Sequence, residues 1–121
     1  MRTKLPVALA TAVAVSALAT ATAFAHETVT STSPGKGKTA SKHISSVTVT
    51  FNGVPRSGTL KVTGPGGKTV SKGSGGRDPR NLKRLKVSLK SGLKAGSYKA
   101  TWKIVASDGD NQTGSFTFKL K

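Results

Sequence analysis

The stretch Tyr98-Lys99-Ala100-Thr101-Trp102-Lys103-Ile104 decides the fold, because apolar and polar residues alternate strictly along it. Successive side chains of a β-strand point to opposite faces, so this period of two sends one set into a core and the other into water. The same alternation recurs in Val47, Val49 and Phe51, in Leu60 and Val62, in Leu85, Val87 and Leu89, and in Phe116, Phe118 and Leu120. No window of useful length has a 3.6-residue apolar repeat, so we predict an all-β chain with at most one helical turn, near residues 78–82.

Turn-forming sequences rich in Gly, Pro and Ser separate these strands. Gly64-Pro65-Gly66-Gly67 is a strong turn signal, and residues 73–80 form the longest irregular stretch, which we interpret as a mobile loop. The spacing of strands and turns is typical of a single domain of about seven strands folded as a two-sheet Greek-key β-sandwich. A closed barrel with a similar number of strands is the alternative architecture.

The N-terminal segment has the features of a signal peptide. A basic start, Met1-Arg2-Thr3-Lys4, precedes an apolar run over residues 7–24, and Ala23-Phe24-Ala25 supplies the small residues of a cleavage site. We therefore predict a signal peptide at residues 1–25 and a β-sandwich domain at residues 26–121. A retained membrane anchor is the alternative, but the run is short and diluted by Thr and Ser. The protein is accordingly expected to be secreted, in the periplasm or the extracytoplasmic cell envelope.

The charge balance is strongly basic. The 121 residues contain 20 Lys and Arg against 4 Asp and Glu, a formal net charge of +16, and no Cys. Loss of Arg2 and Lys4 with the signal peptide leaves 18 basic and 4 acidic residues, a charge of +14. Such a charge favours an anionic partner. Export argues against nucleic acid, and the absence of Cys excludes a disulfide framework, a thiol nucleophile and Cys-ligated metals.

His26 becomes the first residue if cleavage follows Ala25. Its α-amine and its imidazole Nδ1 can then close a six-membered chelate ring on one metal ion. Nitrogen donors of this kind suit Cu(II), which ranks highest in the divalent affinity order. An ordinary α-amine has a pKa of about 8, so a metal can displace its proton near neutral pH.

Asp108-Gly109-Asp110 follows the Trp102 strand and precedes the Phe116 strand, in an expected hairpin connection. Two carboxylates at positions i and i+2 can point to the same side of an extended backbone. Asp-Gly and Asp-Asn sequences are also ordinary turn formers, so a purely structural role for both aspartates is the competing interpretation.

Taken in order, several short motifs resemble the CopC family of exported copper-binding proteins over nearly the whole mature chain. They are the start at His26, Ser31-Thr32-Ser33-Pro34-Gly35-Lys36-Gly37, Val47-Thr48-Val49-Thr50-Phe51, Val62-Thr63-Gly64-Pro65-Gly66-Gly67, Leu93-Lys94-Ala95-Gly96-Ser97-Tyr98-Lys99-Ala100-Thr101-Trp102, Ser107-Asp108-Gly109 and Gly114-Ser115-Phe116-Thr117-Phe118. The resemblance implies an immunoglobulin-like or cupredoxin-like sandwich. It also implies Cu(II) binding by the amine and imidazole of the N-terminal His together with an Asp-x-His motif.

Residue by residue, the resemblance assigns a reduced metal site to His26, Asp108 and Asp110. Asp108 matches the Asp of the motif, whereas the family's second His falls on Asp110, and a family Glu would fall near Gly53. The methionines that some members use for Cu(I) are missing, since Met1 is the only Met. Loss of one imidazole weakens a Cu(II) site, so Zn(II) or no metal remains an alternative. His43 is either a surface residue or the source of the missing imidazole.

Two functional classes remain for this sequence. The first is a monomeric copper carrier of the cell envelope, without enzymatic activity, that sequesters Cu(II) or passes it to a membrane copper transporter. The second is a module without metal whose basic surface docks on anionic wall polymer or lipid. Lys99, Lys103, Lys119 and Lys121 are predicted to point outward, where they also fit a merely solvated face. Glu27, Asp108 and Asp110, three of the four mature acids, are expected near one end of the sandwich.

Overall fold

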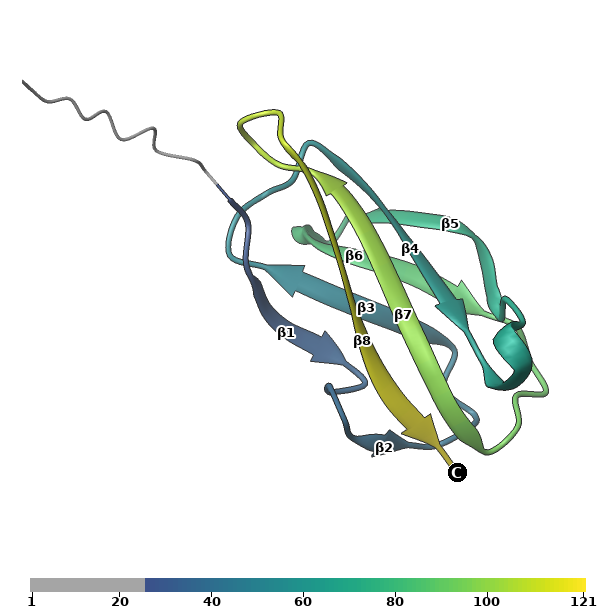
Figure 1. Cartoon of the computed structure of the whole chain (residues 1–121). Coiled ribbons are helices and arrows are strands. Elements are labelled where there is room, and N and C mark those ends of the chain that lie inside the picture. Colours follow the sequence, from purple (N-terminus) through teal and green to yellow (C-terminus); the bar gives the residue numbers. More distant parts are fainter. Residues whose placement is uncertain (1–25) are drawn as a thin grey trace, which may run out of the picture.

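The computed structural model describes residues 26–121, which form two four-stranded sheets packed face to face (Figure 1). The strand order is β1-β3-β6-β5 in the first sheet and β2-β8-β7-β4 in the second. The strands are β1 (Val29–Ser33), β2 (Thr39–Ala40), β3 (Ser46–Phe51), β4 (Ser57–Thr63), β5 (Ser71–Asp78), β6 (Asn81–Leu89), β7 (Gly96–Val105) and β8 (Asn111–Leu120). The two sheets confirm the predicted sandwich, and the edge strand β1 is not paired with the second sheet, which rules out the closed barrel. The predicted signal peptide lies outside the described residues.

The core is built from the alternating positions that the sequence marks. In β7 the inward side chains of Tyr98, Ala100, Trp102 and Ile104 are at most 8% exposed, while Lys99 and Lys103 face water. The two sheets meet at aromatic contacts such as that of Phe51 on β3 with Trp102, whose rings lie edge to face with centroids 5.0 Å apart. Apolar burial of this kind is the main force that holds two sheets together.

The expectation of a mobile loop at residues 73–80 is wrong, because most of that stretch belongs to strand β5. The strand pairs with β6 at Lys72, Gly76 and Arg77, and its register shifts between Lys72 and Gly76. Gly73 and Gly75 adopt positive φ angles of 67° and 66° at this irregularity. Glycine takes such angles without strain, so the bulge keeps the strand in the sheet.

The expected helical turn at residues 78–82 is also wrong. Those residues form the turn of the β5–β6 hairpin, where Asp78 pairs with Asn81 and Asp78 Oδ1 accepts a hydrogen bond from the Arg80 N–H (3.0 Å). The helical element of the described residues is instead a 3₁₀ turn, η1 (Pro65–Gly67), at the predicted Gly-Pro-Gly-Gly turn. Within residues 26–121, no helix has the length and apolar character needed to cross a membrane.

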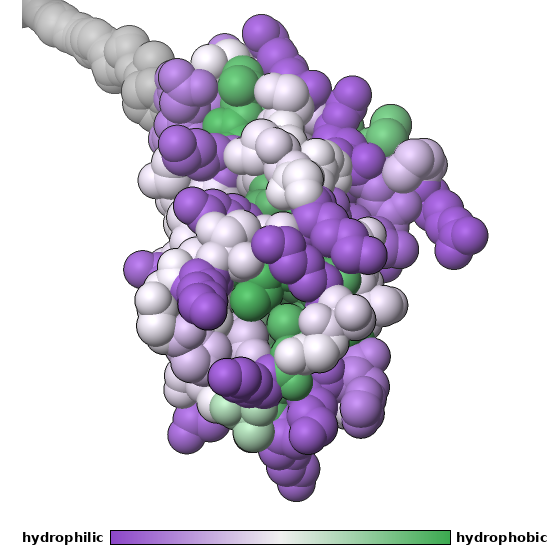
Figure 2. All heavy atoms as spheres, turned by 90° about the vertical axis from the view of Figure 1, so that its right-hand side faces the viewer, coloured by the Kyte–Doolittle hydropathy of each residue, from purple (hydrophilic) through white to green (hydrophobic). Residues whose placement is uncertain are grey.

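The two sides of the sandwich differ. On the β4–β5 side the sheets are joined, because the Val70 N–H donates to the Val62 carbonyl (2.8 Å) and the Val62 N–H donates to Ser71 Oγ (3.0 Å). Figure 2 views this side and shows a largely hydrophilic surface with small separate hydrophobic patches. On the opposite side β1 is an edge strand, and β8 is covered only near its end, by the two-residue β2. This short strand brings the number to eight, against the seven or so predicted.

Candidate metal centre

One side chain, the amide of Gln112, holds the first described residues against the second sheet. The Glu27 N–H donates to Gln112 Oε1 (3.0 Å), and Gln112 Nε2 donates back to the Glu27 carbonyl (2.9 Å). The amide therefore pairs with Glu27 much as a neighbouring strand would, although the two residues are 85 positions apart. Since Gln112 lies at the start of β8, this pairing keeps His26 at the end of the sandwich where β7 turns into β8.

The Glu27 carboxylate is buried beside the same turn. The residue is 5% exposed, and Oε1 accepts a long hydrogen bond from the Ser107 N–H (3.4 Å). A Cβ added to Gly53 would lie 3.1 Å from Oε1, so the glycine leaves room for this carboxylate. Oε2 is buried and accepts no hydrogen bond. A buried carboxylate oxygen without a donor is costly, and a nearby cation would lower that cost.

The β7–β8 turn is held by hydrogen bonds across Ala106 and Asp110. The Gly109 N–H donates to the Ala106 carbonyl (2.9 Å), and the Ala106 N–H donates to the Asp110 carbonyl (2.7 Å). Gly109 has a φ of 93°, which favours glycine at this position. Asp108 Oδ1 accepts from the Asp110 N–H (3.0 Å), so the structural role expected of an Asp-Gly turn is confirmed for that oxygen.

The positively charged side chain of Arg56 lies at the β7–β8 turn. Arg56 Nε donates to the Ser107 carbonyl (3.0 Å), and a Cβ on Gly109 would lie 3.4 Å from Arg56 Nη1. The guanidinium therefore sits against the backbone of residues 107–109. Its charge opposes the binding of a metal ion at the same turn, so a metal held there needs strong donors.

The three predicted ligands His26, Asp108 and Asp110 lie at the same end of the sandwich, and all three are exposed. Asp110 lies two residues before Gln112. Alternate side chains of an extended chain point to the same face, so Asp110 lies on the face of the chain where Gln112 contacts the Glu27 backbone. Among residues 26–121, however, no three His, Asp or Glu side chains are grouped closely enough to hold a metal ion. The structure brings the predicted residues to one end without assembling them into a ligand set.

His43 lies at the other end of the molecule. It is in the connection between β2 and β3, where the Leu89 N–H donates to the Ser45 carbonyl (2.8 Å). Strand β3 runs from Ser46 at that end to Phe51 at the end with Glu27 and Gly53. His43 is thus separated from the candidate centre by the length of a strand and does not supply the missing imidazole.

The acidic residues are more concentrated than the sequence indicated. Asp78, expected in a loop, closes the β5–β6 hairpin beside the β3–β4 connection, where Arg77 Nη1 donates to the Pro55 carbonyl (3.2 Å). The Asp78 carboxylate lies 3.8 Å from Arg84 Nε. All four acids of residues 26–121 therefore lie at the end that carries the β7–β8 turn.

Sequence reasoning missed Gln112, Ser107 and the burial of Glu27. One signal was present for Gln112: in the alternation of β8 it takes an inward position, in line with Phe116 and Phe118, where an apolar side chain is the norm. A polar residue at such a position indicates a partner. Which partner could not be read, because Glu27 is remote in sequence.

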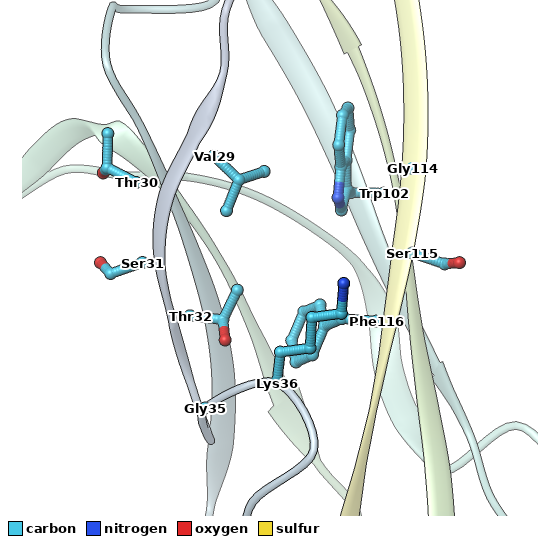
Figure 3. Close-up of a pocket in the computed structure, with 10 residues that line it drawn as sticks. All are labelled: Val29, Thr30, Ser31, Thr32, Gly35, Lys36, Trp102, Gly114, Ser115 and Phe116. Atoms are coloured by element: carbon cyan, nitrogen blue, oxygen red, sulfur yellow. The ribbon is translucent and has the colours of Figure 1, made fainter.

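A cavity lies in the open side between β1 and β8 (Figure 3). It has a volume of about 600 Å³, and Figure 3 shows Val29 and Thr32 of β1 pointing toward it across from Trp102 and Phe116. Gly114 lets the indole of Trp102 lie against β8, since a Cβ there would come within 2.2 Å of Trp102 Cζ2. No acidic or histidine residue lines the cavity, so it is distinct from the candidate metal centre.

Comparisons with known proteins point to one family. Residues 29–121 match the family model described as the CopC domain. The chain is 48% identical over 48 residues to Copper resistance protein C of Pseudomonas syringae pv. tomato, a match that covers 40% of this chain and 36% of that relative. The chain thus spans about a third of the length of that curated relative.

Solved structures give the same result for the fold. CopC from Methylosinus trichosporium OB3b superposes with a TM-score of 0.66 at 22% identity, covering 79% of this chain and 94% of that one. PcoC, a methionine-rich copper resistance protein from Escherichia coli, superposes with a TM-score of 0.64 at 27% identity, covering 80% of this chain and all of its own.

Proposed function

The chain belongs to the CopC family, and on that premise we propose that it is an exported copper-binding protein that holds Cu(II) at the N-terminal end of the sandwich. The observation that carries the proposal is the pairing of Glu27 with Gln112, which places residue 26 beside the turn with Asp108 and Asp110. The ligand set comprises the amine and imidazole of His26 and the carboxylates of Asp108 and Asp110.

Removal of residues 1–25 as a signal peptide is part of the proposal. While residue 25 is attached, the His26 nitrogen is an amide and cannot act as an amine donor. Cleavage creates the second nitrogen of the chelate at the moment of export. The site is then formed only outside the cytoplasm, in the envelope, where the proposed function is needed.

Two nitrogens and two carboxylate oxygens form a donor set that suits Cu(II) better than the other divalent ions. Asp110 in place of the family's imidazole exchanges a nitrogen for an oxygen, which lowers the affinity but adds a negative charge. That charge offsets the Arg56 guanidinium at the turn. The side chains of Asp108 and Asp110 are exposed and can change rotamer when the metal arrives.

The proposed activity is carriage, and it requires no catalytic group. A copper oxidase with a histidine brace needs a second imidazole at the metal, and the second His of residues 26–121, His43, lies at the far end. PcoC is described as methionine-rich, whereas Met1 is the only Met of this chain. Thioether ligation of Cu(I) is therefore not part of the proposal. The carrier acts as a monomer and delivers copper to a membrane copper transporter.

The test is electron paramagnetic resonance with one equivalent of Cu(II) on protein that begins at His26, a start first confirmed by mass spectrometry. We expect a spectrum of mixed nitrogen and oxygen ligation. Addition of one Ala before His26 turns its amine into an amide, so the six-membered chelate is lost and the nitrogen pattern of the spectrum should change. Asp110→His, which restores the family's imidazole, should strengthen binding and increase the nitrogen contribution.

His43→Ala is the matched control, because it also removes one imidazole but at the opposite end. It should leave the spectrum unchanged. The proposal is overturned if the extended and native forms bind copper equally, if neither binds, or if His43→Ala removes the signal.

A further inference from the structure

The outer face of the β4-β7-β8 sheet has a regular pattern of ammonium and hydroxyl groups. Paired residues of neighbouring strands form rows across the sheet, and each of four successive rows contains one Lys, with Thr or Ser at its other outward positions. The rows are Thr59, Lys103 and Thr113; Lys61, Thr101 and Ser115; Thr63, Lys99 and Thr117; and Ser97 with Lys119. We call these residues the Lys/Thr face.

No carboxylate neutralises the Lys/Thr face. The four acids of residues 26–121 lie at the end with the β7–β8 turn, beyond the last of these rows. The outer face of the other sheet is different, since Arg84 there lies 3.8 Å from the Asp78 carboxylate. The Lys/Thr face is therefore a continuous positive surface, and its lysines cannot be explained as partners of acidic neighbours.

The spacing of the rows defines the kind of anion that would fit. Alternate residues of a strand are about 6.7 Å apart, so the face presents one ammonium every 6.7 Å or so along the strand direction. The hydroxyls between them donate to oxygen atoms of an anion or accept from a hydroxyl of a ligand. A linear chain with one charge per repeat of similar length can therefore contact all four lysines at once.

A shallow groove of about 410 Å³ runs along one side of this face. Thr59, Lys61 and Thr63 of β4 line it, together with Thr101 and Lys103 of β7. Gly73 and Ser74, in the bulged part of β5, form its other wall. The groove gives the ligand a recess beside Lys61 and Lys103, two of the four lysines of the Lys/Thr face.

A membrane surface and a single-stranded nucleic acid fit this surface less well. Large exposed hydrophobic side chains among the described residues are Val29, Val54 and Leu82, and none belongs to the Lys/Thr face, so nothing there would insert into a membrane. The aromatic rings of β7 and β8 point into the core and cannot stack on bases, as proteins that bind single-stranded nucleic acid require.

We propose that the Lys/Thr face binds a linear anionic polymer whose repeating unit carries one phosphate and polar, hydroxyl-bearing groups. This binding is independent of copper, because it uses a different part of the molecule from the candidate metal centre. It gives the protein a means of attachment to an anionic polymer while the acidic end stays exposed.

The test uses poly(glycerol phosphate) as the probe and the protein that starts at His26, which contains every strand of both sheets. The change is Lys61→Thr, Lys99→Thr, Lys103→Thr and Lys119→Thr combined, because Thr is favoured at outward strand positions. We expect calorimetry to show binding that weakens with salt, and a loss of at least about tenfold in affinity for the variant at the same salt concentration.

A second variant, matched in charge, replaces four exposed lysines away from this face, Lys42, Lys72, Lys83 and Lys86, with Thr. It should keep its affinity within about twofold, and circular dichroism should show that both variants are folded. Equal losses in the two variants would show that net charge alone drives binding and would overturn the proposal. Tighter binding to anionic phospholipid vesicles, or to a single-stranded oligonucleotide, would overturn it in favour of that partner.

Discussion

The absence of a side chain at Gly114 shapes the packing of the core. The glycine takes an inward position of β8, and its lack of a side chain lets the Trp102 indole lie directly over the strand. The same indole meets Phe51 of the opposite sheet edge to face. One glycine therefore allows the aromatic contact that joins the sheets near the open side.

Gly114→Ala tests this packing. The added Cβ would lie 2.2 Å from Trp102 Cζ2, so the indole or the strand must move. We expect the free energy of unfolding in urea to fall by about 1–3 kcal/mol, the usual effect of overpacking. Gly76→Ala is the control, because a Cβ there meets nothing within 4 Å, and its stability should be unchanged or slightly higher. Equal losses in both variants would contradict the packing argument.

Gln112→Ala tests the pairing with Glu27. The substitution removes both hydrogen bonds to the Glu27 backbone, and we expect a loss of about 1–2 kcal/mol in the free energy of unfolding. Hydrogen exchange by NMR should show loss of protection at the Glu27 amide. The amides of Tyr98 and Trp102 in central strand β7 should keep theirs, and an unchanged Glu27 amide would show that the pairing is not maintained in solution.

At the scale of the elements, β5 shows where sequence patterns fail. Its residues Gly73, Ser74, Gly75 and Gly76 have no apolar alternation, so nothing local predicts a strand. The stretch is a strand because β6 beside it offers unpaired backbone groups, and because its glycines can form the bulge that restores pairing. The strongly alternating segments β3, β6, β7 and β8 were predicted correctly, because the alternation of apolar and polar residues within each strand determines which side chains are buried.

Strand β5 is also joined to β4 by a side chain. The Val62 N–H is buried and donates to Ser71 Oγ (3.0 Å), which closes the β4–β5 side of the sandwich. Ser71→Ala would leave this N–H without an acceptor, and we expect a loss of about 1–3 kcal/mol in urea unfolding. Ser74→Ala, on an exposed residue of the same strand, should have little effect. If the two substitutions had equal effects, Ser71 would not be the link between the sheets.

At the scale of the whole molecule, charge divides the protein into two parts. The acids lie together at the end with the β7–β8 turn, and the lysines cover the sheet faces. The expectation that Glu27, Asp108 and Asp110 lie near one end of the sandwich is confirmed. The position of Asp78 could not be predicted, because it depends on β5 being a strand.

The candidate site was predictable only in part for a related reason. The chemistry of a terminal His and of two aspartates can be read from single residues, and these three residues lie at one end of the fold. Whether they form a ligand set depends on contacts between distant parts of the chain. Glu27, Ser107 and Gln112 owe their roles to such contacts, and no local pattern encodes them.

The pairing of Glu27 with Gln112 has a consequence for folding. It connects positions 85 residues apart, and contacts that close long loops form late because the lost chain entropy must first be offset by other interactions. The β5–β6 and β7–β8 hairpins close short loops and can form early. His26 leaves the ribosome before Gln112 is synthesised and reaches its place only when both sheets have joined. The N-terminal end is therefore among the last parts to be assembled, and a nascent or partly folded chain lacks the proposed copper site.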